Sequence, residues 1–195
     1  MKKIYSKITR ERAPKFQIET AIYQDKTGKK YVAKCPLSTE SEAHIANVCQ
    51  NYKAFSRQSD TLYVECQIEG DGLRFPFISG KSYFEYLLEE AKKDDEANFL
   101  RILQEYKDKV KDLYQECQPF TSSEQFTQIF GVADGQDGTL AVSKLNIDLT
   151  FDNMIIAENG QTKVIDYEWV FDCLVPFKFV YFRAVKAFFV KNQAF

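Results

Sequence analysis

The chain has 195 residues, of which 45% are hydrophobic and 28% are charged, so it can bury a core and has ordinary globular composition. Its 26 basic and 28 acidic residues leave a net charge of −2, which excludes a broad electrostatic attraction for nucleic acid. No stretch reaches the ~18 uncharged apolar residues that a transmembrane segment needs, and the N-terminus lacks the apolar core of a signal peptide.

The first third of the chain predicts short β-strands joined by turns. The β-type runs are residues 4–8, 16–24, 29–35 and 61–78. Residues 25–28, with the sequence Asp-Lys-Thr-Gly, predict a turn between the second and third runs, and Gly70-Asp71-Gly72 predicts a hairpin in the last one.

A helix is predicted from Ser38 onward, after the third strand. Ser38 and Thr39 are capping residues, and Glu42 follows Thr39 at the spacing of a capping box. The first 79 residues therefore predict one small sheet with a helix inserted after its third strand.

After Gly80 the pattern becomes helical. A short helix is followed by a long apolar stripe at helical spacing between residues 99 and 117, whereas residues 118–143 predict no regular structure. The tail from residue 175 is helix-like, with apolar residues nearly all round and several Lys and Arg. It is interpreted either as a buried central helix, which we favour, or as a helix on a membrane surface.

The five cysteines are dispersed, without a Cys-x-x-Cys pair or a nearby histidine. They are Cys35, Cys49, Cys66, Cys117 and Cys173. This pattern indicates reduced thiols in a cytoplasmic protein rather than disulfides or a metal site.

The stretch "KLNIDLTFDNMIIAENGQTKVIDYEW", residues 144–169, places polar residues beside two apolar strands. Asn159-Gly160 predicts a type I′ hairpin turn, which would place Met154 opposite Ile165 and Asn153 opposite Asp166. An amide oxygen and a carboxylate at that spacing can share one hard cation.

Asp148 precedes Asn153 by five residues and joins the same pocket if the intervening loop folds back. Any one of these residues alone is more readily explained as a turn former or cap. The occurrence of Asp148, Asn153 and Asp166 around one hairpin favours a functional site instead.

Asp-Leu-x-x-x-Asn at 148–153, followed by Asp166 thirteen residues after Asn153, resembles the catalytic loop and metal-binding Asp of the protein-kinase-like superfamily. The resemblance implies that Asp148 is the catalytic base, and that Asn153 and Asp166 bind Mg²⁺. It covers most of the chain, from about residue 4 to 190.

The upstream sequence resembles the same superfamily. "YVAKC" at 31–35 is similar to the strand whose lysine contacts the ATP phosphates, which implies that role for Lys34, with Glu40 or Glu42 as its partner. "FPFISGKSYFEYL" resembles the hinge of aminoglycoside-phosphotransferase-like kinases, so that Phe77, Ile78 and Ser79 would present backbone groups to adenine.

A narrower resemblance concerns the stretches "TRERAPKFQI", "DLTFDN" and "VIDYEW". They are similar to kinase-like domains of bacterial glycan-assembly proteins, among them the kinase half of the O-antigen chain-terminating methyltransferase/kinase. The resemblance implies an acceptor hydroxyl on a sugar and membrane-associated glycan-assembly proteins as partners.

The sequence departs from the superfamily pattern in several places, among them Asn146-Ile147 in place of His-Arg or His-Gly before Asp148. "TRERAPKF" stands where a glycine-rich loop would cover the phosphates, and either Arg10, Arg12 or Lys15 binds phosphate through its side chain or this is a solvated loop. Tyr167-Glu168 follows Asp166 in place of Phe-Gly, which disfavours a regulated protein kinase.

These observations predict an α+β, protein-kinase-like domain. Residues 1–79 form an N-lobe of sheet and helix, and residues 80–195 form a shortened helical C-lobe with a β-hairpin at the metal site. The predicted activity is ATP- and Mg²⁺-dependent phosphoryl transfer to a hydroxyl of a small molecule or glycan, in the cytoplasm or at the membrane periphery. The alternative is a pseudokinase-like scaffold without turnover.

Overall fold

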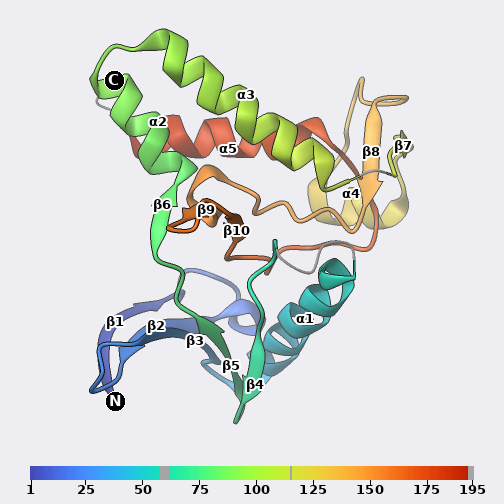
Figure 1. The fold of residues 1–195 in the computed structure, drawn as a ribbon. Helices are drawn as coiled ribbons and strands as arrows, with labels where there is room; N and C mark the ends of the chain where they lie inside the picture. The colour runs from blue at the N-terminus through green and yellow to red at the C-terminus, as the bar shows by residue number, and fades with distance from the viewer. Residues whose placement is uncertain (58–61, 115, 193–195) are drawn as a thin grey trace. The chain divides into compact units, whose positions relative to one another are not determined.

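The computed structural model describes residues 1–57, 62–114 and 116–192. The chain divides into two compact units, Met1–Ser79 and Gly80–Phe195. Among the described residues, the N-terminal unit holds a five-stranded antiparallel sheet and a long helix, and the C-terminal unit holds further helices with two three-stranded sheets (Figure 1). The predicted α+β class, with a sheet-rich first part and a mostly helical second part, is confirmed.

The N-terminal sheet has the strand order β1-β2-β3-β5-β4. Its strands are β1 (Lys2–Ile8), β2 (Ile18–Gln24), β3 (Lys30–Pro36), β4 (Gln67–Glu69) and β5 (Gly72–Pro76). Helix α1 (Thr39–Ser56) follows β3 and lies along the sheet (Figure 1), with Ile45, Val48 and Phe55 buried. The predicted helix after the third strand is confirmed.

Two polar side chains set local boundaries in this unit. The Asp25 carboxylate accepts hydrogen bonds from the backbone N–H groups of Thr27 (2.8 Å) and Lys29 (3.0 Å), which forms the predicted turn between β2 and β3. At the start of α1, the backbone N–H of Ser38 donates to the hydroxyl of buried Ser41 at 3.2 Å. The capping pair is therefore Ser38 with Ser41, and the predicted pair of Thr39 and Glu42 is wrong because the helix begins at Thr39.

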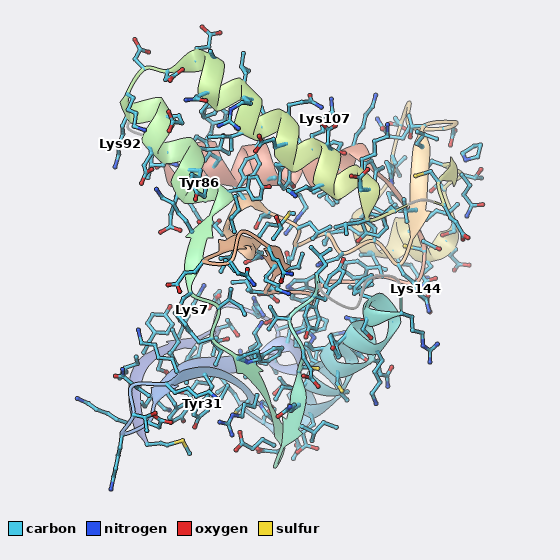
Figure 2. All side chains as sticks on the ribbon, in the orientation of Figure 1. Lys7, Tyr31, Tyr86, Lys92, Lys107 and Lys144 are labelled. Carbon is cyan, nitrogen blue, oxygen red and sulfur yellow. The ribbon has the colours of Figure 1, made fainter. Side chains whose placement is uncertain are left out.

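Aromatic and basic side chains line the sheet on the face that carries Tyr31, which Figure 2 labels. Tyr31 of β3 stacks on Tyr23 of β2, with ring centroids 5.2 Å apart, and the Arg74 guanidinium lies 4.2 Å from the Tyr31 ring centroid. Such cross-strand pairs stabilise a sheet. The two contacts join β2, β3 and β5 through their side chains.

Three helices form the main core of the C-terminal unit: α2 (Tyr83–Lys92), α3 (Glu96–Asp112) and α5 (Lys178–Lys191). Phe188 of α5 contacts Phe84 of α2 and Phe99 of α3, with ring centroids 5.3 and 5.8 Å apart. Figure 1 shows the three helices together. The predicted helices after Gly80 and at the tail are confirmed, and α5 buries Val180 and Ala184 as well as Phe188.

The segment without a predicted structure contains short elements. They are β7 (Gln118–Pro119), α4 (Glu124–Phe130) and β8 (Leu140–Ser143), and β11 (Leu174–Pro176) completes the sheet β11-β8-β7. Phe126 contacts Phe120 edge to face and Phe130 with tilted rings, and the ring centroids are 4.9 Å apart in both pairs. These elements are held by aromatic contacts and are too short to show a hydrophobic period.

The hairpin of β9 (Met154–Ala157) and β10 (Thr162–Val164) differs from the prediction by one residue. Met154 pairs with Val164, whereas the sequence predicted Ile165. The loop is a turn closed by the bond from the Gly160 N–H to the Ala157 carbonyl (2.8 Å), and Gly160 is left-handed with φ +78°. This is a three-residue loop with a type I turn and a glycine bulge, instead of the two-residue type I′ turn.

The change in register removes the predicted direct opposition of Asn153 and Asp166. The carbonyl of Asn153 accepts a hydrogen bond from the Ile165 N–H at 3.0 Å, so these two residues face each other instead. Asn153 ends the 3-10 helix η2 (Phe151–Asn153), where the strand alternation no longer applies. Side-chain hydrogen bonds, and not the strand pairing, therefore bring the predicted site residues together.

Candidate functional site

The predicted base, Asp148, lies in a loop between β8 and η2 with a side chain that is 13% exposed. Its backbone N–H donates to the side-chain oxygen of Asn146 at 3.0 Å, and its carbonyl accepts from the Thr150 N–H at 2.6 Å. Short polar side chains that bond to the backbone two residues later favour such turns. The local sequence therefore fixes the backbone on both sides of Asp148.

Asn146 connects the loop to the segment after β10. Its side-chain nitrogen donates to the carbonyl of Asp166 at 2.9 Å, while its side-chain oxygen accepts from Asp148. The residue is fully buried, and a buried amide with both ends bonded holds the groups it joins in one geometry. The sequence prediction did not include Asn146 in the site.

Asn153 is tied to the same loop. Its side-chain nitrogen donates to the carbonyl of Asp148 at 2.9 Å, which leaves its side-chain oxygen as the atom that can bind a cation. The structure thus brings Asp148, Asn153 and Asp166 together through the amides of Asn146 and Asn153. We refer to residues 146–153, which carry both amides, as segment 146–153.

Asn153 and Asp166 together offer an amide oxygen and a carboxylate, which are ligands that a hard cation prefers. Within residues 1–57, 62–114 and 116–192 there is no cluster of three or more His, Cys, Asp or Glu that could hold a metal ion. A cation held by one acid and one amide is suited to Mg²⁺, which keeps most of its remaining ligands as water or phosphate oxygens. The donor set therefore fits the predicted metal.

Two tyrosines support segment 146–153 from the side of α3. The Tyr106 hydroxyl donates to the carbonyl of Leu149, and the Asn146 N–H donates to the Tyr114 hydroxyl at 3.0 Å. Burial raises the pKa of Tyr106, so its hydroxyl keeps its proton and remains a donor. Neither tyrosine was predicted in the site, because both are more than thirty residues away in the chain.

Two basic residues of α5 contact the same segment. The Arg183 guanidinium donates through Nη2 to Oδ1 of Asp148 (3.0 Å) and through Nε to the carbonyl of Ile147 (2.9 Å). The Lys191 ammonium lies 2.6 Å from Oδ2 of Asp152. From the sequence, Arg183 and Lys191 are predicted only as basic residues of the tail helix, without a contact to the site.

In the N-terminal unit, Lys34 lies on β3 between Thr20 of β2 and Leu73 of β5. It is 5% exposed, and its Nζ lies 5.9 Å from the ring centroid of Phe75. A lysine is rarely this buried unless its charge has a function or a partner. The burial agrees with a functional role for Lys34, and its contact with ATP phosphates stays a prediction.

Glu40 and Glu42, the predicted partners of Lys34, are exposed in the first turn of α1. Acidic side chains at that place interact favourably with the helix dipole. The pairing of either one with Lys34 stays a prediction. His44, on the same helix, is buried, and its ring centroid lies 5.3 Å from that of Phe16.

The loop that replaces the glycine-rich sequence has a fixed backbone of its own. The Gln17 side-chain nitrogen donates to the carbonyls of Arg10 (3.1 Å) and Arg12 (2.8 Å). The buried Thr9 hydroxyl accepts from the Ile18 N–H at 3.0 Å and closes the base of the loop. Arg10 is exposed and Arg12 is half-buried, and the binding of phosphate by their side chains stays a prediction.

The predicted hinge residues Phe77, Ile78 and Ser79 lie between β5 and β6 (Gly80–Ser82), where no regular structure is assigned. Phe77 is half-buried beneath Lys30, whose Nζ lies 5.1 Å from the ring centroid. A Cβ at Gly80 would lie 2.3 Å from the Ile156 carbonyl oxygen, so only glycine allows β6 to approach β9. The binding of adenine by these residues stays a prediction.

The solved structures that are similar to this chain include phosphotransferases. A type I macrolide 2'-phosphotransferase aligns with a TM-score of 0.49 and 10% identity over 97% of this chain and 73% of that chain. Macrolide 2'-phosphotransferase MphH from Brachybacterium faecium aligns with a TM-score of 0.46 and 11% identity over 94% and 76%. An aminoglycoside phosphotransferase from Alicyclobacillus acidocaldarius subsp. acidocaldarius DSM 446 aligns with a TM-score of 0.41 and 12% identity over 90% and 66%. No protein-family model and no curated protein sequence matches the chain.

Proposed function

We propose that the protein is a kinase-type phosphotransferase that uses ATP and Mg²⁺ to phosphorylate a hydroxyl group of a small molecule or glycan. The observation that carries this proposal is the hydrogen-bonded arrangement of Asp148, Asn153 and Asp166 around the buried amide of Asn146. These bonds link the backbone of Asp148 and Asp166 to the two amides, which supports a shared site for a carboxylate, an amide oxygen and a second acid of the kind that phosphoryl transfer uses.

In the proposed reaction, Asp148 orients the acceptor hydroxyl and takes its proton. A bond forms between the acceptor oxygen and the γ-phosphorus, the bond from that phosphorus to the β–γ bridging oxygen breaks, and ADP leaves. Asn153 and Asp166 would hold Mg²⁺, which supplies charge neutralisation at the phosphates. Positioning and electrostatic stabilisation account for most of the rate in such reactions.

The remaining predicted residues are assigned to the nucleotide. Lys34 would bind the phosphates, with Glu40 or Glu42 as its partner, and the backbone of residues 77–79 would bind adenine. Arg10 and Arg12 would replace the backbone N–H groups of a glycine-rich loop. The bonds from the Gln17 side chain to the carbonyls of Arg10 and Arg12 hold the loop backbone in place, which supports a role for the arginine side chains in binding phosphate.

Replacement of Asp148 by Asn tests the proposal directly. We expect Asp148→Asn to lower kcat for phosphoryl transfer from labelled ATP by about 10²–10⁴-fold, since general-base catalysis contributes about that much, while ATP affinity stays within about twofold. Asp172→Asn, at an exposed acid near Lys144, is the matched control and should retain wild-type turnover. Equal turnover in wild type and Asp148→Asn would contradict the assignment.

A scaffold without turnover is the second candidate. It is favoured by the glycine-free loop between β1 and β2 and by Glu168 in place of the glycine that follows the metal-binding acid in kinases. In that case both wild type and Asp148→Asn would be inactive toward nucleotide sugars, lipid-linked glycans and water as acceptors.

The cellular setting is part of the proposal. All five cysteines are free thiols, which supports a reducing, cytoplasmic environment, and no helix in the described part of the chain is long and apolar enough to cross a bilayer. We propose polysaccharide assembly as the process, with glycan-assembly proteins as partners. The α5 helix supports attachment to a membrane surface, because it has four basic and no acidic residues and exposes Phe182, Phe189 and Val190.

A further inference from the structure

Asp148, the base of the proposed reaction, accepts a hydrogen bond from Arg183 of helix α5. Arg183 of α5 lies 35 residues beyond Asp148, and it donates to two groups of segment 146–153 at once. One is Oδ1 of Asp148 at 3.0 Å, and the other is the carbonyl of Ile147 at 2.9 Å.

These two bonds have different consequences for Asp148. The bond to the carbonyl fixes the guanidinium against the backbone directly before Asp148, and the bond to Oδ1 then fixes the carboxylate relative to the guanidinium. Because a guanidinium is planar and rigid, the pair of bonds sets the rotamer of Asp148 as well as its distance from α5.

The hydrogen bond from Arg183 to Asp148 is compatible with the proposed role of Asp148 as the base. A carboxylate accepts at roughly four lone-pair sites, so a bond from Arg183 to Oδ1 leaves capacity for the hydroxyl of an acceptor. Segment 146–153 has a second anchor on the same helix, since Lys191 lies two helical turns after Arg183 and pairs with Asp152 at 2.6 Å. The helix α5 therefore holds the segment at both ends.

Arg183 is also suited to mutation, because it is not a core residue. Its side chain is 36% exposed, whereas the side chain of Asp148 is 13% exposed. The core contacts of α5 come from Val180, Ala184 and Phe188 on another face of the helix. Loss of the Arg183 head group should therefore disturb Asp148 without unfolding α5.

We infer that Arg183 is a positioning residue of the proposed phosphotransferase, which holds the Asp148 carboxylate in the orientation that receives the acceptor proton. The inference rests on the proposed function. It assigns to Arg183 an effect on the chemical step that is exerted through Asp148, and no contact with the nucleotide.

A double-mutant cycle tests this inference with Mg-ATP as substrate and water as acceptor. We expect Arg183→Met to lower kcat by about 10–100-fold, as expected for a misplaced catalytic group, with KM for ATP unchanged within about twofold. In the Asp148→Asn background the same replacement should lower kcat by less than about twofold, because its target is already lost. Arg183→Lys keeps the positive charge but loses the planar guanidinium that donates to two acceptors at once. Its kcat should therefore lie between those of Arg183→Met and wild type.

Lys186→Met, one turn after Arg183 on the exposed side of α5, is the matched control and should retain the wild-type kcat. Thermal unfolding of each variant checks that the fold is kept. A wild-type kcat in Arg183→Met, or an equal loss in the wild-type and Asp148→Asn backgrounds, would overturn the positioning role while leaving the proposed function intact. Absence of turnover in the wild type, with water and with every acceptor, would instead refute the proposed function and the inference that rests on it.

Discussion

Asn146 is the residue on which the geometry of segment 146–153 depends most directly. Its side-chain nitrogen bonds to the carbonyl of Asp166 and its side-chain oxygen accepts from the Asp148 N–H, both at a fully buried position. Replacing it removes a donor and an acceptor together, and leaves the Asp148 N–H and the Asp166 carbonyl, on half-buried residues, without those partners. Asn146 thus serves the fold and the proposed chemistry with the same two bonds.

We expect Asn146→Ala to lower the free energy of unfolding by about 2 kcal/mol or more, because each buried group left unsatisfied costs about 1–3 kcal/mol. Its kcat should fall with little change in ATP affinity. Urea denaturation measures the first effect, and Gln128→Ala, on the exposed side of α4, provides the control. A loss below about 0.5 kcal/mol, as for an ordinary surface position, would show that the amide does not hold the loop.

The sequence predicted Asp148, Asn153 and Asp166 as a group. The predicted pairing of Asn153 opposite Asp166 across the hairpin is wrong, because the register differs by one residue. Glycine at position 160 indicated a tight turn correctly, yet a left-handed glycine closes either a two-residue or a three-residue loop. The choice between these loops depends on the strand pairs, which the local sequence does not determine. Arg183 could not be predicted at all, since its contact with Asp148 arises from the packing of α5.

At the scale of helices and strands, α5 has one face that packs in the core and another that exposes aromatic side chains. Val180, Ala184 and Phe188 are buried, whereas Phe182 and Phe189 on another face are 58% and 56% exposed. The sequence predicted a buried central helix and offered a membrane-surface helix as the alternative. The helix packs through the face of Val180, Ala184 and Phe188 and is not buried all round, and its exposed aromatic face leaves the second interpretation as a proposal.

We expect the protein to sediment with phosphatidylcholine vesicles that contain phosphatidylglycerol, and not with phosphatidylcholine alone. The basic residues of α5 would be attracted to anionic lipid while Phe182 and Phe189 insert at the interface. The double replacement of these two residues by Ala should abolish the binding, and Lys186→Glu should weaken it.

Leu100→Ala removes a 53% exposed apolar side chain from α3 and is the control for the vesicle experiment. It should bind like wild type. Equal loss of binding in this variant, or self-association of the wild type through α5 in the absence of lipid, would contradict a lipid-binding role for the helix.

Most of the elements themselves were predictable, because their signals are local. The strands before residue 37, the hairpin around Gly70 and the helices after Gly80 each carry a hydrophobic period or a turn sequence. The small sheet β11-β8-β7 was not predictable, since its strands have two to four residues and its register comes from contacts distant in the chain.

At the scale of the whole molecule, the chain consists of two compact units that meet in sequence between Ser79 and Gly80. The N-terminal unit carries Lys34 and the loop with Arg10 and Arg12, and the C-terminal unit carries the arrangement around Asp148. We propose that these units correspond to the two lobes of one kinase-like domain, as the sequence predicted. Each unit contains buried hydrophobic residues, such as Ile18 and Val48 in the first and Tyr106 and Val180 in the second.

Stability of the C-terminal unit should fall at alkaline pH. Tyr83 is fully buried in α2, and burial raises its pKa to about 12 from an ordinary value near 10. In the unfolded chain this hydroxyl ionises near pH 10, so its contribution to stability is complete below pH 10 and is lost as the pH rises toward 12.

Tyr83→Phe isolates this effect, because phenylalanine cannot ionise. We expect its melting temperature, followed by circular dichroism, to gain on that of wild type as the pH rises from 9 to about 12. A constant difference between the two proteins over this range would contradict the assignment. Tyr86→Phe, at a residue with a partly exposed ring beside Lys81, serves as the control.

The Ile147 N–H donates to the carbonyl oxygen of Trp169 at 3.0 Å, and Trp169 is the single tryptophan of the chain. The indole is stacked with Phe171, with ring centroids 6.4 Å apart. Because the backbone of Trp169 is bonded to the residue directly before Asp148, we expect its fluorescence emission to change when this segment moves, without any attached dye. Titration with nucleotide or acceptor can be followed through this intrinsic signal, which makes the search for the substrate an optical measurement on the unlabelled protein.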